Sequence, residues 1–468
     1  MKLREIFKNI LYSLSSNILS LLISIILTLV VPKVLGVKDY SYWQLYVFYT
    51  SYVAFFHFGW VDGIYLKIGG QDYSEINHSN LRNQFWLMFI FEIILSIILL
   101  VGVLLFSINT NKKIVLIFSV LNIIIVPLRT FLLFILQSTN RIKEFAKYNR
   151  LDRILYFFIT IIYLLFGGRN ITNLLLFDII AKSVSLIFAM KSCKEIVFPP
   201  IFKVKPVIKE IVDNIQIGSK LMLSYIASLL IIGIIRFGIE KRWDITVFGQ
   251  VSLTLSLSNL LLTFINAIGI VMFPMLRRMD EKKLPIVFVK ISNIINPFLY
   301  TCLLFFYPAR IILINWLPKY SDSVFYLGIL FPIFIYESKM SLLYNTYLKS
   351  LRKEKYILKI NLVSLFLSIV LTLIGTLLMN NILLTILSIV VVVVFRATLA
   401  ETYLHSILGI GKKKVINSEL MLTILFVSLN LYFSYQSSFV VYTFVLALYL
   451  YRYRNAIKES VRMIVEYY

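Results

Sequence analysis

The sequence predicts an all-α integral membrane protein with about 14 transmembrane helices, each formed by roughly 20 apolar residues. Of the 468 residues, 59% are hydrophobic and 15% are charged, whereas soluble domains carry about 25% charged residues. The formal net charge is +24, and the basic residues stand between apolar runs. This spacing is typical of membrane topology and not of a nucleic-acid-binding surface, so we expect membrane lipid, and no nucleic acid, as a partner.

Fourteen segments are apolar and long enough to be considered spans, although the fifth, ninth and last are short. In chain order they are 9–31, 42–66, 84–108, 114–137, 154–168, 171–190, 216–235, 247–275, 291–306, 323–347, 360–379, 382–407, 416–434 and 438–451. The first segment holds 23 uncharged residues and lacks a small-residue cleavage site. We therefore expect a retained span there and not a signal peptide.

The basic residues also predict the orientation of the chain. With the N-terminus placed inside, 32 Lys and Arg residues fall in inner loops and tails, and 10 fall in outer loops. Cytoplasmic loops carry such an excess, so we expect a multi-pass protein of the cytoplasmic membrane with both termini cytoplasmic. The longest outer loop would be 307–322, which is too short to fold as a domain.

One inner connection is longer and amphipathic. Its "PVIKEIVDNIQIG" segment places Val207, Ile208, Ile211, Val212 and Ile215 on one helical face, which predicts a helix on the inner membrane surface. The chain would then comprise an N-terminal six-helix lobe (1–190), this linker (191–215), a C-terminal six-helix lobe (216–410), and a terminal helix pair with a cytoplasmic tail (411–468). Because six is even, the lobes would be parallel repeats about an axis along the membrane normal.

Polar residues form a stripe on two of the predicted spans. Asn17 accompanies a row of serines in the first span. In the eighth, Ser252, Ser256, Asn259, Thr263 and Asn266 recur every three or four residues, which is one helical face. Small polar side chains allow helices to pack closely, and they also line water-filled cavities. We keep both readings, and the second makes Asn17, Asn259 and Asn266 candidates for substrate binding.

Charged residues inside spans are costly, at about 2.5–3.5 kcal/mol each near the bilayer centre, and they usually face a cavity or a partner. The basic ones are Arg129, Lys182, Lys220, Lys339 and Arg396, and the acidic ones are Asp62, Glu92, Asp178, Glu337 and Glu401. Asp178 and Lys182 are four residues apart and can neutralise each other. Arg129 and Arg396 have no acidic neighbour three or four residues away, so each either binds an anion or pairs with another helix.

These charges supply the remaining candidate site residues. We expect Arg129, Arg396, Lys182 and Lys339 to contact an anionic substrate, and a guanidinium can grip phosphate with two hydrogen bonds. Asp62, Glu92 and Glu337 are candidates for gating or for coupling to a proton or sodium ion. Three scattered histidines and two cysteines give neither a metal site nor a disulfide framework, so no metal and no cofactor is expected.

Three blocks carry a family resemblance: "NILYSLSSNILSLLISIILTLVVPKVLGVKDYSYWQLY", "FGWVDGIYLKIGG" and "FGQVSLTLSLSNLLLTFINAIGIVMFPMLRRM". The chain resembles the Wzx-type polysaccharide or O-antigen flippases of the multidrug/oligosaccharidyl-lipid/polysaccharide exporter superfamily over nearly its whole length. The positions that match are Asn17, Leu35-Gly36, Phe58-Gly59 and Lys67. Trp43 and Trp60 depart from the small residues usual in this family.

The resemblance implies two lobes around a central cavity, lined by the first, second, seventh and eighth spans and open alternately to each side. It implies a flippase for polyprenyl-diphosphate-linked oligosaccharide in surface polysaccharide biosynthesis, and no enzymatic activity. A cation or drug antiporter of the same superfamily is the first alternative, although the spans hold as many basic as acidic residues. A membrane polymerase or glycosyltransferase is the second, and it would need a larger outer loop than the sequence offers.

Overall fold

The structure is a computed structural model, and it describes residues 21–106, 109–198, 207–277, 279–410 and 415–466. All regular elements in this described part are helices. Contacts within the chain divide it into two compact units, here called the N-terminal unit, Leu29–Ile226, and the C-terminal unit, Ala227–Tyr468 with residues 21–28. The division into lobes, linker and terminal pair expected from the sequence stays a prediction.

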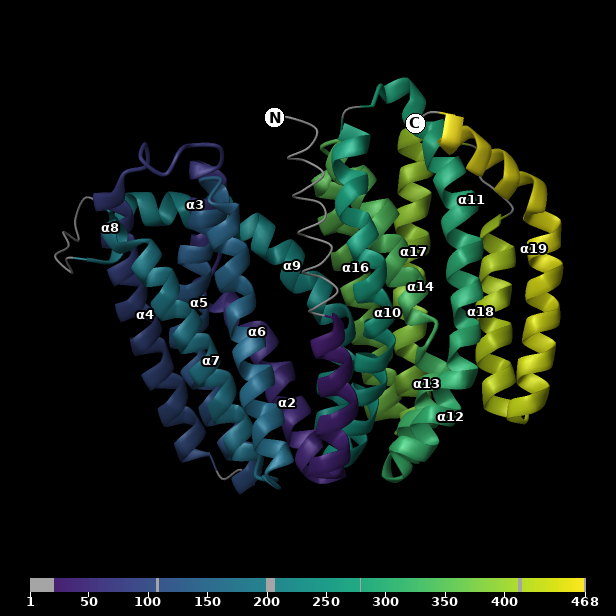
Figure 1. Cartoon of the computed structure of the whole chain (residues 1–468), viewed down its shortest axis with the longest axis horizontal. Coiled ribbons are helices and arrows are strands. Elements are labelled where there is room, and N and C mark those ends of the chain that lie inside the picture. Colours follow the sequence, from purple (N-terminus) through teal and green to yellow (C-terminus); the bar gives the residue numbers. More distant parts are fainter. Residues whose placement is uncertain (1–20, 107–108, 199–206, 278, 411–414, 467–468) are drawn as a thin grey trace. The chain divides into compact units, whose positions relative to one another are not determined.

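The N-terminal unit is a bundle of helices built from the first half of the chain (Figure 1). After an apolar helix, Leu21–Leu35, its elements are α2 (Val37–Val53), η1 (Ala54–His57), α3 (Trp60–Ile68), α4 (His78–Leu105), α5 (Thr110–Ser138), α6 (Ile142–Leu165), α7 (Ile171–Ser192), the short α8 (Lys194–Val197), and the beginning of α9 (Ile208–Arg242). Helix α5 packs against α2, α3, α4, α6 and α7, so it forms the centre of this unit.

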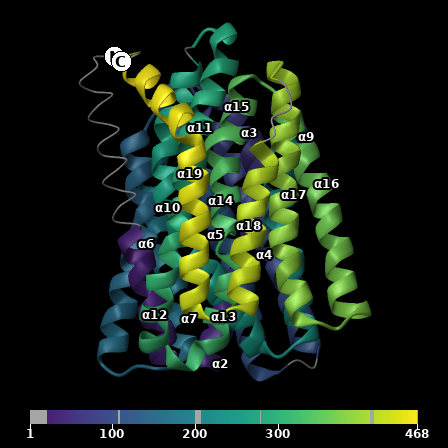
Figure 2. The same ribbon diagram turned by 90° about the vertical axis from the view of Figure 1, so that its right-hand side faces the viewer.

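The C-terminal unit continues from the second part of α9. Its elements are α10 (Ile245–Arg277), η2 (Glu281–Lys283), α11 (Leu284–Cys302), η3 (Leu303–Phe305), α12 (Phe306–Trp316), η4 (Pro318–Tyr320), α13 (Ser321–Leu330), α14 (Ile333–Ser338), the π-helix η5 (Lys339–Tyr344), α15 (Asn345–Ser350), α16 (Glu354–Leu373), the π-helix η6 (Ile374–Leu378), α17 (Ile382–Leu408), α18 (Val415–Tyr432) and α19 (Tyr435–Glu466). The last two lie side by side, and α19 also packs on α11 (Figure 2).

Asparagine begins four of the long helices. The side chains of Asn77, Asn109, Asn170 and Asn381 each accept a hydrogen bond from a backbone N–H in the first turn of α4, α5, α7 and α17. The first turn of a helix has free N–H groups, and asparagine is among the best residues for satisfying them. These caps fix where the polar connections end and the apolar spans begin.

The burial of the helices separates central from outer ones. In the most apolar 18-residue stretch of α5, and likewise of α17, half of the residues are buried within the structure. In the corresponding stretch of α4, only 17% of the residues are buried. On α4, Ile94, Ile97, Ile98 and Val101 are exposed. A continuous apolar surface on a long helix is suited to lipid and not to water. Helix α4 is therefore an outer, lipid-facing helix of the N-terminal unit.

The prediction of a multi-helix membrane protein is confirmed. Among the described residues, eight helices are long and apolar enough to cross a membrane, and the bent pair Pro318–Leu330 and Ile333–Ser350 makes up to nine. Most of the described residues in each of the fourteen predicted spans are helical. The remaining ones are short, such as α2 and α18, or carry charges that lower their mean hydropathy, such as α6 and α19.

Two segments expected to lie outside the spans are helical, and the predicted linker helix is continuous with the next span. The prediction of a loop over 307–322 is wrong, because α12 and η4 occupy most of this segment. Helix α11 continues through η3 into α12. The inner tail after residue 451 continues as α19 up to Glu466. The amphipathic linker is the first part of α9, where Ile211 and Ile215 pack against the apolar core of the N-terminal unit. Polar and charged residues in these segments therefore do not mark the ends of the helices.

Candidate functional site

The second predicted span, 42–66, is broken in its second half. Phe58 and Gly59 both adopt the left-handed conformation, with φ of 52° and 86°, between η1 and α3. Such a φ is strained for phenylalanine and natural for glycine. The Gly59 N–H donates to Nδ1 of His57 at 3.1 Å, which partly replaces the helical hydrogen bonds lost at the break. His57 and Asp62 are both buried, with Nε2 and Oδ2 3.8 Å apart.

Glycines bring α3 and the first part of α9 into backbone contact. A Cβ atom on Gly63 would meet the backbone of Asn214 at under 3.0 Å, and one on Gly218 would meet the backbone of Gly59 and Gly63. Real side chains essentially never tolerate such distances, so only glycine fits at these two positions. The close approach holds the broken end of the second span against α9.

A polar network reinforces this contact. The Gln84 Oε1 atom accepts from Trp60 Nε1 at 2.8 Å and from Asn214 Nδ2 at 3.0 Å, which joins α3, α4 and α9. At the exposed edge, Lys67 donates to Glu210 at 2.5 Å. Trp60, which departs from the small residues of the family pattern, thus has a defined role as a hydrogen-bond donor in a buried position. Lys67 is an ion-paired residue in this structure.

The two basic candidates in the N-terminal unit have acidic partners. Arg129 is 8% exposed, and its guanidinium lies 3.1 Å from the Asp152 carboxylate and donates to Ser185 Oγ at 2.9 Å. Lys182 donates to Asp178 at 2.6 Å, as their spacing predicted. Asp178 also accepts from the hydroxyl of Tyr46. These pairs neutralise charges that would otherwise be costly in a membrane.

Glu92 differs from every other candidate in this unit. It is fully buried in α4, and neither of its carboxyl oxygens has a hydrogen-bond partner in the part of the chain that the structure describes. An ionised carboxylate buried without a partner is very unfavourable. Glu92 is therefore best accommodated as a neutral acid.

In the C-terminal unit, Arg396 lies at the centre of α17 and contacts three other helices. It is 4% exposed, and its Nη1 lies 3.1 Å from Glu337 Oε1 on α14. The remaining donors reach Asn361 Oδ1 on α16 at 3.1 Å and Ser228 Oγ on α9 at 2.7 Å. Of the two readings kept for Arg396, the structure shows the ion pair with another helix.

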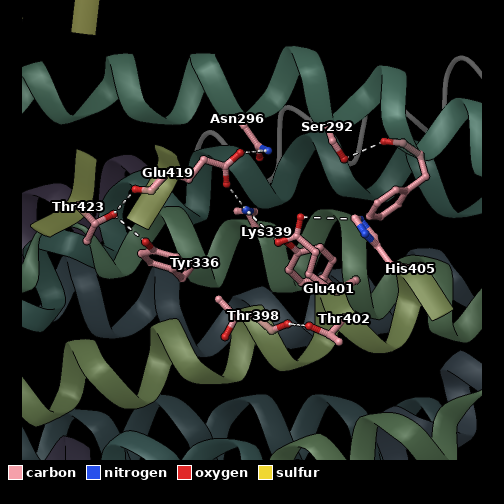
Figure 3. Close-up of polar contacts among 12 residues, drawn as sticks. Ser292, Asn296, Tyr336, Lys339, Thr398, Glu401, Thr402, His405, Glu419 and Thr423 are labelled. Carbon is pink, nitrogen blue, oxygen red and sulfur yellow. Dashed lines mark hydrogen bonds and ion pairs between the residues drawn. The ribbon is translucent and has the colours of Figure 1, made fainter. Parts of the chain in front are cut away.

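Lys339 belongs to a larger cluster, shown in Figure 3. Its ammonium group lies between two carboxylates, 2.7 Å from Glu419 Oε2 and 3.6 Å from Glu401 Oε2. On the far side, His405 Nε2 lies 3.9 Å from Glu401 Oε1, and Asn296 Nδ2 donates to Glu419 at 2.7 Å. The members come from α11, η5, α17 and α18, so the cluster joins the terminal pair to the rest of the unit.

The polar stripe on α10 changes character along its length. Ser252 is buried, and its hydroxyl accepts from Arg236 at 2.9 Å, whereas Asn259 is exposed. A second, buried row that the sequence analysis missed faces α13: Gln250 donates to Asp322, and Thr254 to the Ser323 carbonyl. The stripe thus contributes to packing at one end. Asn17 and the side chain of Asn266 lie outside the described residues.

Two acidic partners were also missed from the sequence. Asp152 was assigned to an inner loop. In the structure it lies within α6, which begins at Ile142, and it forms an ion pair with Arg129. Glu419 lies near the start of the thirteenth predicted span and was not counted among the charges in spans. Counting every Asp and Glu in or beside a predicted span would have included both residues, although not their partners. Among the described residues, no group of three or more His, Cys, Asp or Glu side chains could hold a metal ion.

No family model and no curated protein matches the sequence. Among solved structures, the chain is similar to one described as lipid II flippase MurJ in an inward closed conformation. The TM-score is 0.54 at 15% sequence identity, and the match covers 97% of this chain and 99% of that chain. The likeness concerns the fold alone. It agrees with the all-helical, multi-pass membrane architecture predicted from the sequence.

Proposed function

We propose that this chain is a flippase of the multidrug/oligosaccharidyl-lipid/polysaccharide exporter superfamily that moves a polyprenyl-diphosphate-linked oligosaccharide across the cytoplasmic membrane by alternating access. The observation that carries the proposal is the fold, which is similar to that of a structure described as lipid II flippase MurJ over almost the whole length of both chains. The Wzx-like sequence blocks support the polysaccharide pathway as its setting. Both termini would lie in the cytoplasm.

The chemistry of this substrate explains why a protein is needed. A hydrated oligosaccharide with a diphosphate cannot cross hydrocarbon unaided, and buried cations lower the barrier for the anionic part. The lipid tail can stay in the bilayer. Arg396 is a candidate for the diphosphate because Glu337, its present anionic partner, could be exchanged for a phosphate of the same charge sign. Arg129, Lys182 and Lys339 would contribute in the same way.

The helical structure of residues 307–322 favours a transporter over a membrane enzyme. The segment that offered the most room for an outer catalytic loop is largely helical. The proposal is tested in the producing cell by depleting the protein. Lipid-linked oligosaccharide should then accumulate on the inner leaflet while surface polysaccharide falls, and unchanged levels of both would refute the assignment.

Glu92→Gln should retain a normal protein level and lose ion-coupled transport. Glutamine has the shape of the neutral acid but cannot release a proton, and Glu92 has no partner among the described residues whose loss would destabilise the fold. The measurement is surface polysaccharide beside membrane protein level. Glu354→Gln, at an exposed carboxyl, is the matched control. Full export by Glu92→Gln would remove Glu92 from the coupling step.

A further inference from the structure

The cluster around Lys339 contains one more negative than positive charge when its histidine is neutral. Lys339 supplies one positive charge, and Glu401 and Glu419 supply two negative ones. The Lys339 and Glu419 side chains are 3% and 4% exposed, and that of Glu401 is 12% exposed. A buried net charge is unfavourable unless something compensates it. One added proton makes the cluster neutral.

We propose that Glu401 and His405 form a proton-binding site, in which one proton is shared across a small cavity and neutralises the excess negative charge of the Lys339–Glu401–Glu419 cluster. The two side chains are one helical turn apart on α17, with Glu401 Oε1 and His405 Nε2 separated by 3.9 Å. This distance is too long for a direct hydrogen bond and short enough for one water molecule to bridge.

A cavity of about 20 Å³ lies at this place, which is room for about one water molecule. Glu401, His405 and Asn296 line it, together with Ser292 and Asn293 of α11. The Asn296 Oδ1 atom is buried and has no hydrogen-bond partner among the described residues, although Nδ2 of the same amide donates to Glu419. An unsatisfied buried acceptor beside such a cavity indicates an occupant that donates hydrogen bonds, such as water or hydronium.

Ionisable side chains from six helical elements face the cluster. Tyr344 donates to Glu401 at 2.8 Å, and Tyr336 contacts Thr423 at 2.6 Å. The ionisable side chains that face the cluster are Tyr300 from α11, Tyr336 from α14, Lys339 and Tyr344 from η5, Glu401 and His405 from α17, Glu419 from α18 and Tyr449 from α19. Only the Glu401–His405 pair borders the cavity.

The presence or absence of this proton would determine how strongly Lys339 interacts with Glu401 and with Glu419. With the proton on the Glu401–His405 pair, Lys339 is drawn to Glu419, the closer carboxylate at 2.7 Å. Without it, Glu401 carries a full charge and competes for the same ammonium group from 3.6 Å. Because Glu419 belongs to α18 and Lys339 to the π-helix η5, the proton would control how tightly α18 is held. π-Helical segments are often found at functional sites.

The test is pH-difference infrared spectroscopy of the purified, liposome-reconstituted protein without any substrate. We expect a carboxyl signal that appears with protonation and is lost in Glu401→Gln, and that is shifted in His405→Gln. Glu354→Gln, which removes an exposed carboxyl outside the cluster, should leave that signal in place. Glu401→Gln keeps the side-chain shape and an oxygen that accepts from Tyr344.

A difference spectrum of Glu401→Gln that matches the wild type overturns the proposal. If that variant does not fold, His405→Gln decides alone, since an unshifted carboxyl signal there shows that the two groups share no proton. The role of this proton in coupling rests on the proposed transport function, but its binding does not. A protein that binds the proton here and moves no lipid-linked sugar would therefore refute the transport function and leave this site intact.

Discussion

Gly63→Ala should sharply reduce the amount of folded protein in the membrane, while Gly102→Ala should not. The added methyl group at Gly63 would meet the backbone of Asn214 at under 3.0 Å, so one of the two helices must move. Overpacking of this kind typically costs about 1–3 kcal/mol, and backbone cannot rotate away as a flexible side chain can. Gly102 lies in α4 with nothing within 4 Å of its Cβ position, and alanine is the better helix former by roughly 0.5–1 kcal/mol.

The comparison is made by expressing both variants and measuring the monodisperse protein extracted from the membrane, with thermal unfolding of what remains. Gly218→Ala should behave like Gly63→Ala, because its Cβ would meet the backbone of Gly59 and Gly63. If Gly63→Ala unfolds at the same temperature as Gly102→Ala, the close contact between α3 and α9 is not a feature of the native protein.

Arg396→Ala should lower protein abundance, and removing Glu337 as well should restore much of it. The guanidinium is 4% exposed and pairs with Glu337 at 3.1 Å, so its loss leaves a carboxylate without its cation. Breaking a buried pair from one side costs about 3–5 kcal/mol, whereas removing both charges is often close to neutral. Arg396→Lys should be intermediate, because one ammonium group cannot reach Glu337, Asn361 and Ser228 together.

The readout is membrane protein level beside surface polysaccharide in the single and double variants. Arg396→Ala/Glu337→Ala also separates stability from transport. If the double variant is abundant and does not export, Arg396 or Glu337 contributes to transport beyond the stability that their pair provides. A well-expressed Arg396→Ala single variant would contradict the importance of the pair for stability.

The fourteen predicted spans fall on helices because the signal for them, long apolar runs, is local in the sequence. The ends of several helices were predicted incorrectly, and α12 is an example. Residues 307–316 were assigned to an outer loop, yet helix continues from α11 through η3 into α12. The break falls in the block that holds Phe58 and Gly59, whose glycines permit a bend and a close helix approach, but the left-handed φ at Phe58 has no signal in the sequence.

The candidate charges were found from the sequence, but their partners were not. Only Asp178 and Lys182 lie on neighbouring turns of one helix, and this pair was predicted. Arg129, Lys339 and Arg396 pair with residues that are 23, 80 and 59 positions away. Such pairs are set by which helices pack together, and a single sequence holds no direct signal for that. The sequence therefore identified the charged residues inside spans, but it did not identify the carboxylate that neutralises each basic residue.

The central claim, that this chain flips a lipid-linked oligosaccharide, is tested most directly in liposomes that contain only the purified protein and a polyprenyl-diphosphate-linked oligosaccharide. The substrate is placed in the outer leaflet, and its headgroup is followed with an enzyme that cannot cross the membrane and cleaves only exposed sugar. We predict that a fraction of the headgroup becomes protected with time in the presence of the protein, and that empty liposomes show no protection. Full cleavage at all times, with the reconstituted protein folded and monodisperse, would contradict the claim.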